Sequence, residues 1–262
     1  MSLTGKTLAA SYKDLLHMNN SNNGVTTSSV RVVDGEGTES SILISDDQLI
    51  VSPKNDNSTN TLIVRKVDGT DVLVVDTTNE VVKASGNNVN TQYATFSIVN
   101  SESASFADDT HQAIPFGCAN FGDSSNPPAF GTGTDPATSF TTAEGNATRA
   151  SDIVPCLWYV HDNISIDAVK SIEGADTATG DTTRMHLMSF DLTSGSTSAL
   201  SNGTVLANNS DVTNAGSEQA YLSSWTVSSA AVSSGKVILA FFKSDSINSD
   251  YSLSVQIKYH LT

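Results

Sequence analysis

Basic residues are scarce in this chain: 13 lysines and arginines stand against 28 aspartates and glutamates, a formal net charge of −15. A surface of this sign repels polyanions, so the composition argues against nucleic acid and against membrane insertion through anionic lipid. Long apolar runs are also missing. No stretch approaches the roughly 18 residues that a membrane span needs, and the first residues have no signal-peptide core. We therefore expect synthesis in a cytoplasm.

Cysteines and catalytic motifs are few as well. Cys118 and Cys156 could pair, but we expect two reduced, buried thiols in a protein made in a cytoplasm. No G-x-S-x-G, H-E-x-x-H, Walker or C-x-x-C pattern occurs. Glu173 and Asp181 lie in polar stretches, where solvated charge is the expected state. We predict no enzyme, no catalytic residue, no cofactor and no metal site.

Histidines are equally uninformative about chemistry. Asp108-Asp109-Thr110-His111 could offer oxygen and nitrogen ligands, but no second cluster has a readable metal spacing. His186 and His260 fall on expected strands, where we expect them on a wet face or at an interface. Gly131-Thr132-Gly133-Thr134 lacks a following lysine, so we expect a turn and not a phosphate-binding loop.

Serine, threonine and asparagine are abundant, and they suit turns and polar strand faces better than helices. The predicted fold class is therefore all-β. The N-terminus is the exception, because four apolar residues fall on one face of a short amphipathic helix. Residues 1–24 are expected to form a segment that attaches to another protein through this face, which consists of Leu8, Tyr12, Leu15 and Leu16.

Residues 25–90 contain a weak repeat. Segment 28–52 reads strand, Asp-Gly turn, strand, polar turn, strand, and segment 60–85 repeats this plan, with Asp34-Gly35 matching Asp68-Gly69. Asp-Gly between apolar runs is a strong hairpin signal. Strands such as VLVV are apolar on both faces, and three short strands cannot cover themselves.

Two ways of covering these strands remain open. The repeats pack on the C-terminal region, or identical chains intertwine around a three-fold axis, and repeats that cannot hide their own faces favour the second. For this trimeric β shaft, the predicted interface residues are Ile42, Ile44, Leu49, Leu62, Val64, Leu73, Val75 and Val81.

Residues 91–262 contain longer strand-like runs. Apolar and polar residues alternate through 251–261, which predicts a strand with one wet face, and the apolar run KVILAFFK (236–243) is expected to be central. Other expected strands lie at 94–99, 156–160, 164–172, 185–192 and 220–227. Seven or eight strands with polar turns predict an antiparallel β-sandwich that is jelly-roll-like.

Several stretches resemble one group of proteins. TLAASYKDLLHMNNSNNGV, followed by RVVDGEGTESSILIS, resembles the N-terminal part of virion-appendage proteins of marine tailed bacteriophages. NTLIVRKVDGTDVLVVDTTNEVV is similar to the trimeric shaft repeats of phage tail fibres. KVILAFFKSDSINSDYSLSVQIKYHLT looks like the C-terminal β domain on such shafts, as does IVPCLWYVHDNISIDAVKSIEGADTATGDTTRMHLMS. The resemblance implies a homotrimer in the virion, held by another virion protein at its N-terminus and exposed at its C-terminus.

The function expected from this resemblance is adhesion to the host surface, with a glycan as the expected ligand. Sugars stack on aromatic rings, and Tyr221 and Trp225 are the residues we expect at the receptor contact, whereas Trp158 is favoured as a core residue. Loops 122–140 and 173–184 are long enough to carry contacts. Two alternatives stay open: a capsid decoration or head fibre with a structural role, and a glycan depolymerase that uses paired carboxylates.

Overall fold

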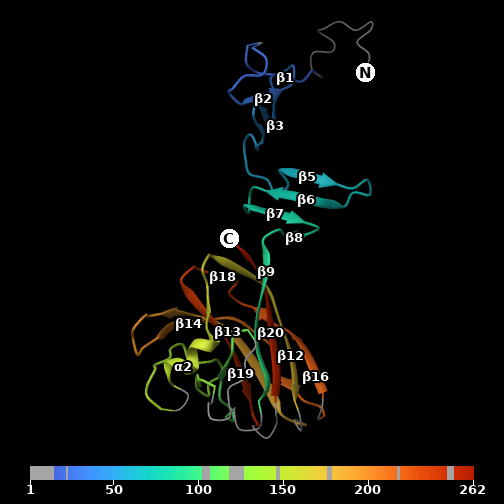
Figure 1. Cartoon of the computed structure of the whole chain (residues 1–262). Coiled ribbons are helices and arrows are strands. Elements are labelled where there is room, and N and C mark those ends of the chain that lie inside the picture. The colour runs from blue at the N-terminus through green and yellow to red at the C-terminus, as the bar shows by residue number, and fades with distance from the viewer. Residues whose placement is uncertain are drawn as a thin grey trace. The chain divides into compact units, whose positions relative to one another are not determined.

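The structure, a computed structural model, describes residues 15–21, 23–101, 107–117, 127–145, 148–175, 179–216, 219–246 and 251–262. About half of the chain is in strands, which form several antiparallel sheets (Figure 1). The chain divides into two compact units, Met1–Val89 (unit 1) and Asn90–Thr262 (unit 2). The prediction of a β protein is confirmed at this level.

Unit 1 contains two four-stranded antiparallel sheets, and in each the strands follow one another in chain order. The first sheet consists of β1 (His17–Met18), β2 (Val30–Val33), β3 (Glu39–Ile44) and β4 (Leu49–Val51). The second consists of β5 (Leu62–Arg65), β6 (Asp71–Asp76), β7 (Val81–Ala84) and β8 (Asn87–Asn88). Both predicted strand–turn–strand repeats are therefore present.

The first turns of the two repeats show that Asp34-Gly35 was wrongly matched with Asp68-Gly69. Backbone bonds close the loops Asp34–Thr38 and Lys66–Thr70 in the same way, since the amide of the first residue donates to the carbonyl of the last at 3.1 and 2.9 Å. The glycines with positive φ are Gly37 (+84°) and Gly69 (+90°), so Gly35 does not correspond to Gly69. The loops are three residues long and end in a left-handed glycine, and a two-residue Asp-Gly turn is absent at both.

The expected N-terminal helix lies mostly outside the described residues. Leu15 and Leu16 are described, and neither is helical. The first strand, β1, begins directly after them. Leu8 and Tyr12 are not described, so their expected place on an apolar helix face stays a prediction.

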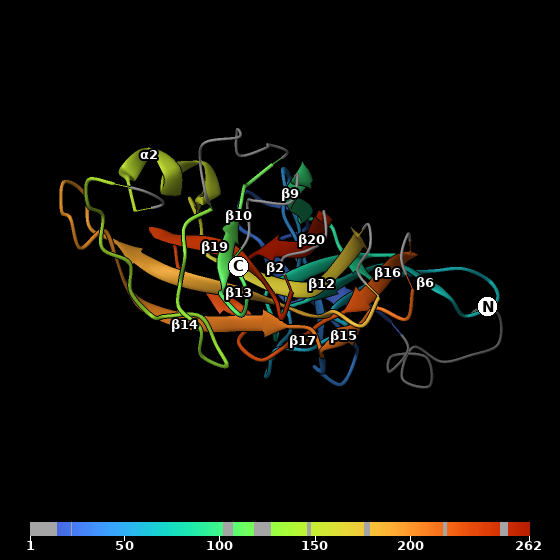
Figure 2. The same cartoon turned by 90° about the horizontal axis from the view of Figure 1, so that it is seen from below.

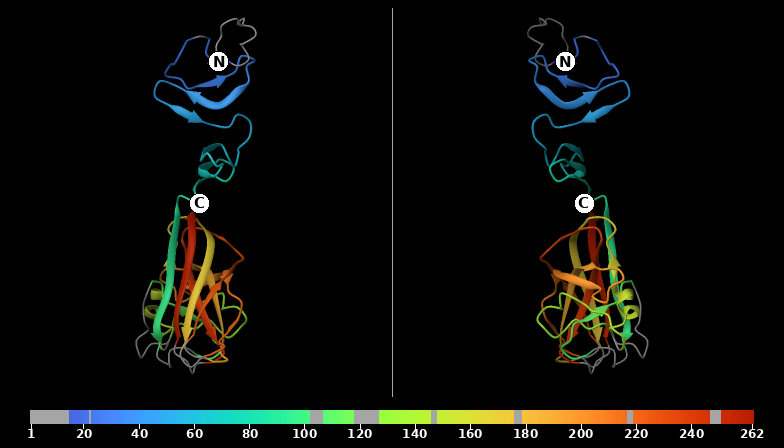
Figure 3. Two further views of the ribbon diagram at one scale, coloured as in Figure 1. Left: turned by 90° about the vertical axis from the view of Figure 1, so that its right-hand side faces the viewer. Right: turned by 90° about the vertical axis from the view of Figure 1, so that its left-hand side faces the viewer.

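Unit 2 is built around two antiparallel sheets. The smaller sheet has the order β16-β12-β20-β9, and its strands are β9 (Thr91–Ser101), β12 (Ile164–Ala175), β16 (Gln219–Ser224), β20 (Tyr251–Leu261) and β18 (Ala231–Val232), which pairs with β12. Figure 3 shows β9, β20 and β12 side by side. The bounds of β20 are those predicted from the alternation, and its odd-numbered residues from 251 to 257 are buried.

The larger sheet has the order β10-β19-β13-β14-β17. Figure 2 shows its strands β19, β13 and β14 as neighbours. Its seven strands are β10 (Gln112–Ile114), β11 (Trp158–Tyr159), β13 (Thr182–Leu192), β14 (Leu200–Asn208), β15 (Val212–Thr213), β17 (Thr226–Val227) and β19 (Lys236–Ser244).

Helix is a minor component. Within the described residues it amounts to α2 (Ala150–Ile153) and the 3-10 turn η2 (Val154–Cys156) that continues it. Cys156 is thus in a helical turn and not in the strand expected at 156–160. None of the helices in the described ranges is long and apolar enough to span a membrane.

Strand β19 is central, as its sequence predicts, because both of its faces are covered. Phe242 contacts Tyr251 of β20 at 4.8 Å between ring centroids, so this face lies against the smaller sheet. Phe241, on the other face, contacts Phe130 at 4.6 Å. Phe130 belongs to residues 127–140, which cross the outer face of the larger sheet and which we call the strap. A strand buried on both sides reads as a continuous apolar run.

Gly203 lets the strap pass close to β14. Its amide donates to the Thr138 carbonyl at 2.8 Å. A Cβ at this position would lie 2.7 Å from Thr138 Cα and 2.6 Å from Phe190 Cε1. Such distances are below van der Waals contact, so a glycine is required here for steric reasons.

Gly203→Ala is therefore expected to destabilise unit 2 by about 1–3 kcal/mol, the usual cost of overpacking. Urea unfolding followed by tryptophan fluorescence measures this, because the two tryptophans of the chain, Trp158 and Trp225, are both buried in unit 2. Gly174→Ala in β12 is the matched control, since nothing lies within 4 Å of a Cβ there. Equal stability of the two variants would contradict the close approach of the strap.

Candidate functional site

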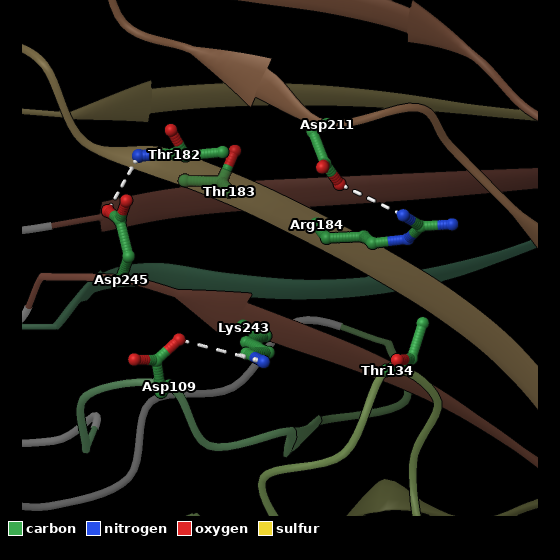
Figure 4. A pocket seen from close by; sticks show the side chains of 8 residues that line it. All are labelled: Asp109, Thr134, Thr182, Thr183, Arg184, Asp211, Lys243 and Asp245. Carbon is green, nitrogen blue, oxygen red and sulfur yellow. Dashed lines mark hydrogen bonds and ion pairs between the residues drawn. The ribbon is translucent and has the colours of Figure 1, made fainter.

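The two ends of unit 2 differ. At one end the chain enters at Asn90, whose Nδ2 donates to the carbonyl of Leu261 at the end of β20, at 2.7 Å. At the opposite end β12 gives way to β13, and β19 gives way to β20. A cavity of about 330 Å³ opens at this second end (Figure 4), and it is lined by Asp109, Thr134, Thr182, Thr183, Arg184, Asp211, Lys243 and Asp245.

Two cations are direct cross-strand neighbours in this cavity, since Arg184 of β13 pairs with Lys243 of β19. Like charges in such positions repel one another. Each cation forms an ion pair with a different aspartate: Arg184 Nη1 lies 3.1 Å from Asp211 Oδ1, and Lys243 Nζ lies 3.6 Å from Asp109 Oδ1. The aspartates are more exposed than the cations. Two parallel ion pairs therefore line the cavity, with the acids at the mouth.

A third aspartate fixes the start of β13. Asp245 Oδ1 accepts a hydrogen bond from the Thr182 amide at 2.7 Å. The Asp245 amide in turn donates to the Thr182 carbonyl at 3.1 Å, which joins the ends of the two strands. The Thr182 hydroxyl lies 3.1 Å from that of Thr213 in β15. The cavity wall is thus held by backbone bonds and not only by side chains.

The strap closes another side of the cavity. Lys243 Nζ donates to the carbonyls of Thr132 and Gly133 at 3.5 and 3.3 Å. The segment Gly131–Thr134 is a bend, and the residues that directly follow it are not helical. It therefore presents carbonyl groups to a cation, and it does not resemble the start of a phosphate-binding helix.

Two histidines lie next to the cavity, and they correct the expectation that His186 is a wet-face residue. His186 is two residues from Arg184 on the same face of β13, and the strap buries it completely. Its ring meets that of His111 edge to face, with 4.9 Å between centroids. Nε2 of His186 lies 3.2 Å from Asp135 Oδ1, without hydrogen-bond alignment. His111 Nε2 donates to the Gly133 carbonyl at 3.1 Å.

Burial keeps both imidazoles neutral. It lowers the pKa of His186 to about 4, with further lowering from His111 and Arg184 and an opposing contribution from Asp135. Burial also lowers the pKa of His111. Within the described residues, Nδ1 of each ring has no hydrogen-bond partner. The pair is therefore poorly prepared to accept a proton.

Glu173 also departs from expectation, because it is buried in β12 and is not a solvated loop charge. Both of its carboxyl oxygens lie 2.8 Å from the hydroxyl of Thr183. Burial raises the pKa of Glu173 to about 7, against the lowering effect of that hydroxyl. Asp181 accepts a hydrogen bond from the Tyr251 hydroxyl at 3.1 Å. Both carboxyl groups are thus engaged by hydroxyl groups at this end of unit 2.

Glu173→Gln is expected to stabilise unit 2 at alkaline pH. The folded pKa lies above the unfolded value of 4.5, so the stability contributed by the wild-type carboxyl is complete below pH 4.5 and is lost as pH rises through 7. The shift corresponds to about 3 kcal/mol. Urea unfolding should show the variant more stable at about pH 8.5 and equal to wild type near pH 4. A constant difference at both pH values would contradict the raised pKa.

The two aromatic residues expected at a receptor contact do not form a site together. The indole of Trp225 is buried, and its Nε1 donates to Ser171 Oγ at 2.9 Å. This corrects the expectation for Trp225, because no ring face is open for stacking. Tyr221 is half-buried, and its hydroxyl donates to Gln219 Oε1 at 2.6 Å and accepts from the Ala215 amide at 2.7 Å. Trp158 is buried, as predicted.

In unit 1 the strands β5, β6 and β7 of the second sheet share an aliphatic face, and β8 adds Asn87 at its edge, beside Ala84. Cross-strand pairing places Leu62, Val75 and Val82 in one row and Val64, Leu73 and Ala84 in the next. The opposite face carries Lys83 and Asp76. Four of the predicted interface residues, Leu62, Val64, Leu73 and Val75, therefore lie together, whereas Val81 lies on the opposite face.

The first sheet has an aliphatic face of its own. Ile44 pairs with Val30 and with Leu49, and Ile42 pairs with Val51, so these five residues share one face. Arg31 lies on the opposite face with Leu43 and Ile50. The predicted interface residues of this sheet, Ile42, Ile44 and Leu49, are thus brought together.

Neither aliphatic face is covered. In the described part of unit 1, Val33 is the one buried apolar side chain, and the eight predicted interface residues are exposed or half-exposed. Leu49, for example, is 69% exposed. Leu15 and Leu16, the described members of the expected attachment face, are exposed too. The described residues of unit 1 therefore form no core of their own.

The remaining site expectations concern cysteines and metals. Cys156 has a free, buried thiol, whose pKa burial raises, whereas Cys118 lies outside the described residues. Among the residues that the structure describes, no group of three histidine, cysteine or carboxylate side chains is placed to hold a metal ion. Of the two residues considered as metal ligands, Asp109 lines the cavity and His111 belongs to the buried pair with His186.

Sequence reasoning missed the cavity, because its residues come from five separate segments. One signal was available. With only 13 basic residues in the chain, an arginine and a lysine within strands 185–192 and 236–243, or directly before them, are notable, since strand interiors disfavour them.

Comparison with known proteins yields no relative, since no protein-family model matches the chain and no curated protein matches it.

Proposed function

We propose that this chain is the subunit of a homotrimeric bacteriophage virion fibre, in which unit 1 forms an intertwined β shaft and unit 2 is displayed for adhesion to the host surface. The observation that carries the proposal is the pair of uncovered aliphatic sheet faces in unit 1. Exposed aliphatic patches of this kind mark protein interfaces. Sheets of short strands also need a covered face to be stable in water.

Copies of the same chain are the cover that best fits these faces. The two faces of each sheet differ: one is aliphatic, and the other mixes aliphatic residues with a cation, Arg31 in the first sheet and Lys83 in the second. Three such sheets around an axis bury their aliphatic faces against one another and leave the charges in water. The two sheets follow the same plan, as expected for shaft repeats that are stable only when stacked or intertwined.

The strand order of unit 2 supports a jelly roll. Its eight principal strands along the chain are β9, β10, β12, β13, β14, β16, β19 and β20. Numbered one to eight, they have the order 6-3-8-1 in the smaller sheet and 2-7-4-5 in the larger one. Two Greek keys wound into a double sheet have this order, and the architecture is common in viral capsid proteins and lectins.

Adhesion follows from presenting three such units on one stalk. Weak sites on a rigid carrier bind a surface strongly when several engage at once, because the second and third contacts are intramolecular. Attachment to the particle is assigned to the N-terminal segment with Leu8, Tyr12, Leu15 and Leu16. The exposure of Leu15 and Leu16 supports this, since they need a partner to cover them.

Native mass measurement tests the oligomer. Three chains of 27.4 kDa give about 82 kDa, and this species is expected in light scattering at about 1 µM. A folded 27.4 kDa monomer at that concentration would overturn the shaft. Immunogold labelling of purified virions with antibodies to unit 2 tests the location. Label at the tail supports a tail fibre, label on the shell supports the head-fibre alternative, and unlabelled particles contradict both.

A further inference from the structure

We infer that the cavity formed around Arg184 and Lys243 binds an uncharged saccharide through hydrogen bonds. The inference rests on the proposed adhesion role, and it names the class of ligand and the site. Its argument depends on the charge, the hydrogen-bonding groups and the rigidity of the eight lining residues (Figure 4).

Charge excludes the obvious reading of an arginine–lysine pair as an anion site. The described residues of the lining include two cations and three carboxylates, a net charge of −1, and each cation is already paired with an aspartate. The chain as a whole carries −15. A carboxylated or sulfated glycan would have to displace Asp211 or Asp109 against this field, so an acidic ligand is disfavoured.

Hydrogen-bonding capacity remains after the ion pairs have formed. Asp109, Asp211 and Asp245 each use Oδ1, and in the described part of the chain Oδ2 of each has no partner. Arg184 uses Nη1 for Asp211, and its side chain remains 31% exposed, so the guanidinium still faces the cavity. A sugar hydroxyl donates one hydrogen bond and accepts others, so alternating carboxylate and guanidinium groups suit neighbouring hydroxyls.

The geometry is also rigid enough for recognition. Arg184 and Lys243 are fixed as cross-strand neighbours, Asp245 is bonded to the backbone of β13, and Lys243 is bonded to the strap. The volume of about 330 Å³ is at the lower end of ligand cavities. None of the described residues that line it is aromatic, so the groups available for binding there form hydrogen bonds and do not stack. These features favour a single uncharged sugar ring or a short neutral glycan.

A glycan array tests the inference with labelled full-length protein. The array carries neutral hexose, deoxyhexose and N-acetylhexosamine glycans beside carboxylated, sulfated and amino-sugar glycans at equal density. Wild type is expected to bind a neutral class. The double variant Asp109→Asn, Asp211→Asn keeps the side-chain shapes and changes the lining charge from −1 to +1. It is expected to lose the neutral ligand by at least about tenfold and to gain acidic glycans.

Asp162→Asn is the matched control, because Asp162 is an exposed acid beside Asn163, whose carbonyl accepts from the Thr262 amide at the opposite end of unit 2. It should bind as wild type does. Tryptophan fluorescence confirms that the double variant is folded. A wild type that prefers acidic or amino-sugar glycans, or that binds none of the array, overturns the inference.

Unchanged binding by the folded double variant overturns the site as well. These results are separate from failure of the proposed function. A protein of trimer mass that labels virions keeps the fibre assignment even if its cavity is inert, whereas a monomer absent from virions removes that assignment whatever sugar it binds.

Discussion

Leu73→Asp is expected to abolish the proposed trimer and to leave a 27.4 kDa monomer or an aggregate. Leu73 lies in the central strand β6, between Val64 and Ala84, on the aliphatic face of its sheet. In a three-fold shaft the substitution places three carboxylates in one apolar interface. An unpaired buried charge costs about 3–5 kcal/mol, so three cost about 10 kcal/mol or more. Size exclusion with light scattering measures the result.

Val67→Asp is the control for this experiment. Val67 lies in the Lys66–Thr70 loop and is fully exposed, so the same new charge should leave the oligomer unchanged. Trp158 and Trp225 report whether unit 2 stays folded in either variant. A trimer that survives Leu73→Asp would show that the aliphatic face is not the interface.

Acidification is expected to destabilise unit 2 through His186. Its folded pKa of about 4 lies below the unfolded value of 6.5, so the unfolded chain takes up the proton first. The stability is complete above pH 6.5 and is lost as pH falls towards 4, by about 3 kcal/mol. His186→Phe keeps the edge-to-face contact with His111 and cannot be protonated. The variant should therefore become more stable than its parent as pH falls.

Glu173 changes the stability of unit 2 in the opposite direction over the same pH range, because its raised pKa favours the folded state in acid. The comparison is therefore made in the Glu173→Gln background, by urea unfolding followed with tryptophan fluorescence between about pH 4 and pH 8. The groups that face the His186 ring, namely His111, Arg184 and Asp135, are present in both proteins, so the two pH profiles differ only through residue 186. Parallel pH profiles for the two proteins would refute the role of His186.

Local patterns predicted the elements well where one rule acted alone. The alternation of 251–261 gave β20 with its bounds, and the apolar run at 236–243 identified the central strand β19. Two repeats of three short strands were also found from their turns. The matching of Gly35 with Gly69 was wrong. The equivalent positions are the left-handed glycines that end the two loops, Gly37 and Gly69.

Contacts between segments that are distant in the chain could not be predicted from the sequence. Strand β14 (Leu200–Asn208) was missed because its polar residues and Gly203 weaken the strand pattern, although the strap covers it. The buried pair of His111 and His186 joins residues 75 positions apart. Glu173 was expected in solvent because its sequence neighbours are polar, and Thr183, which holds it, comes from the next strand. Trp225 was misplaced for the same reason.

Unit 2 has a core and the described part of unit 1 has none, and this difference predicts the order of events in the proposed assembly. Unit 2 buries its own aromatic and aliphatic side chains, so it can fold on each chain as soon as that chain is made. Under the proposed assembly, unit 1 gains an interior only when three chains meet, so its formation depends on subunit concentration. Refolding at low protein concentration should therefore yield chains in which unit 2 is folded and unit 1 is not. The yield of the proposed trimer should rise steeply with protein concentration.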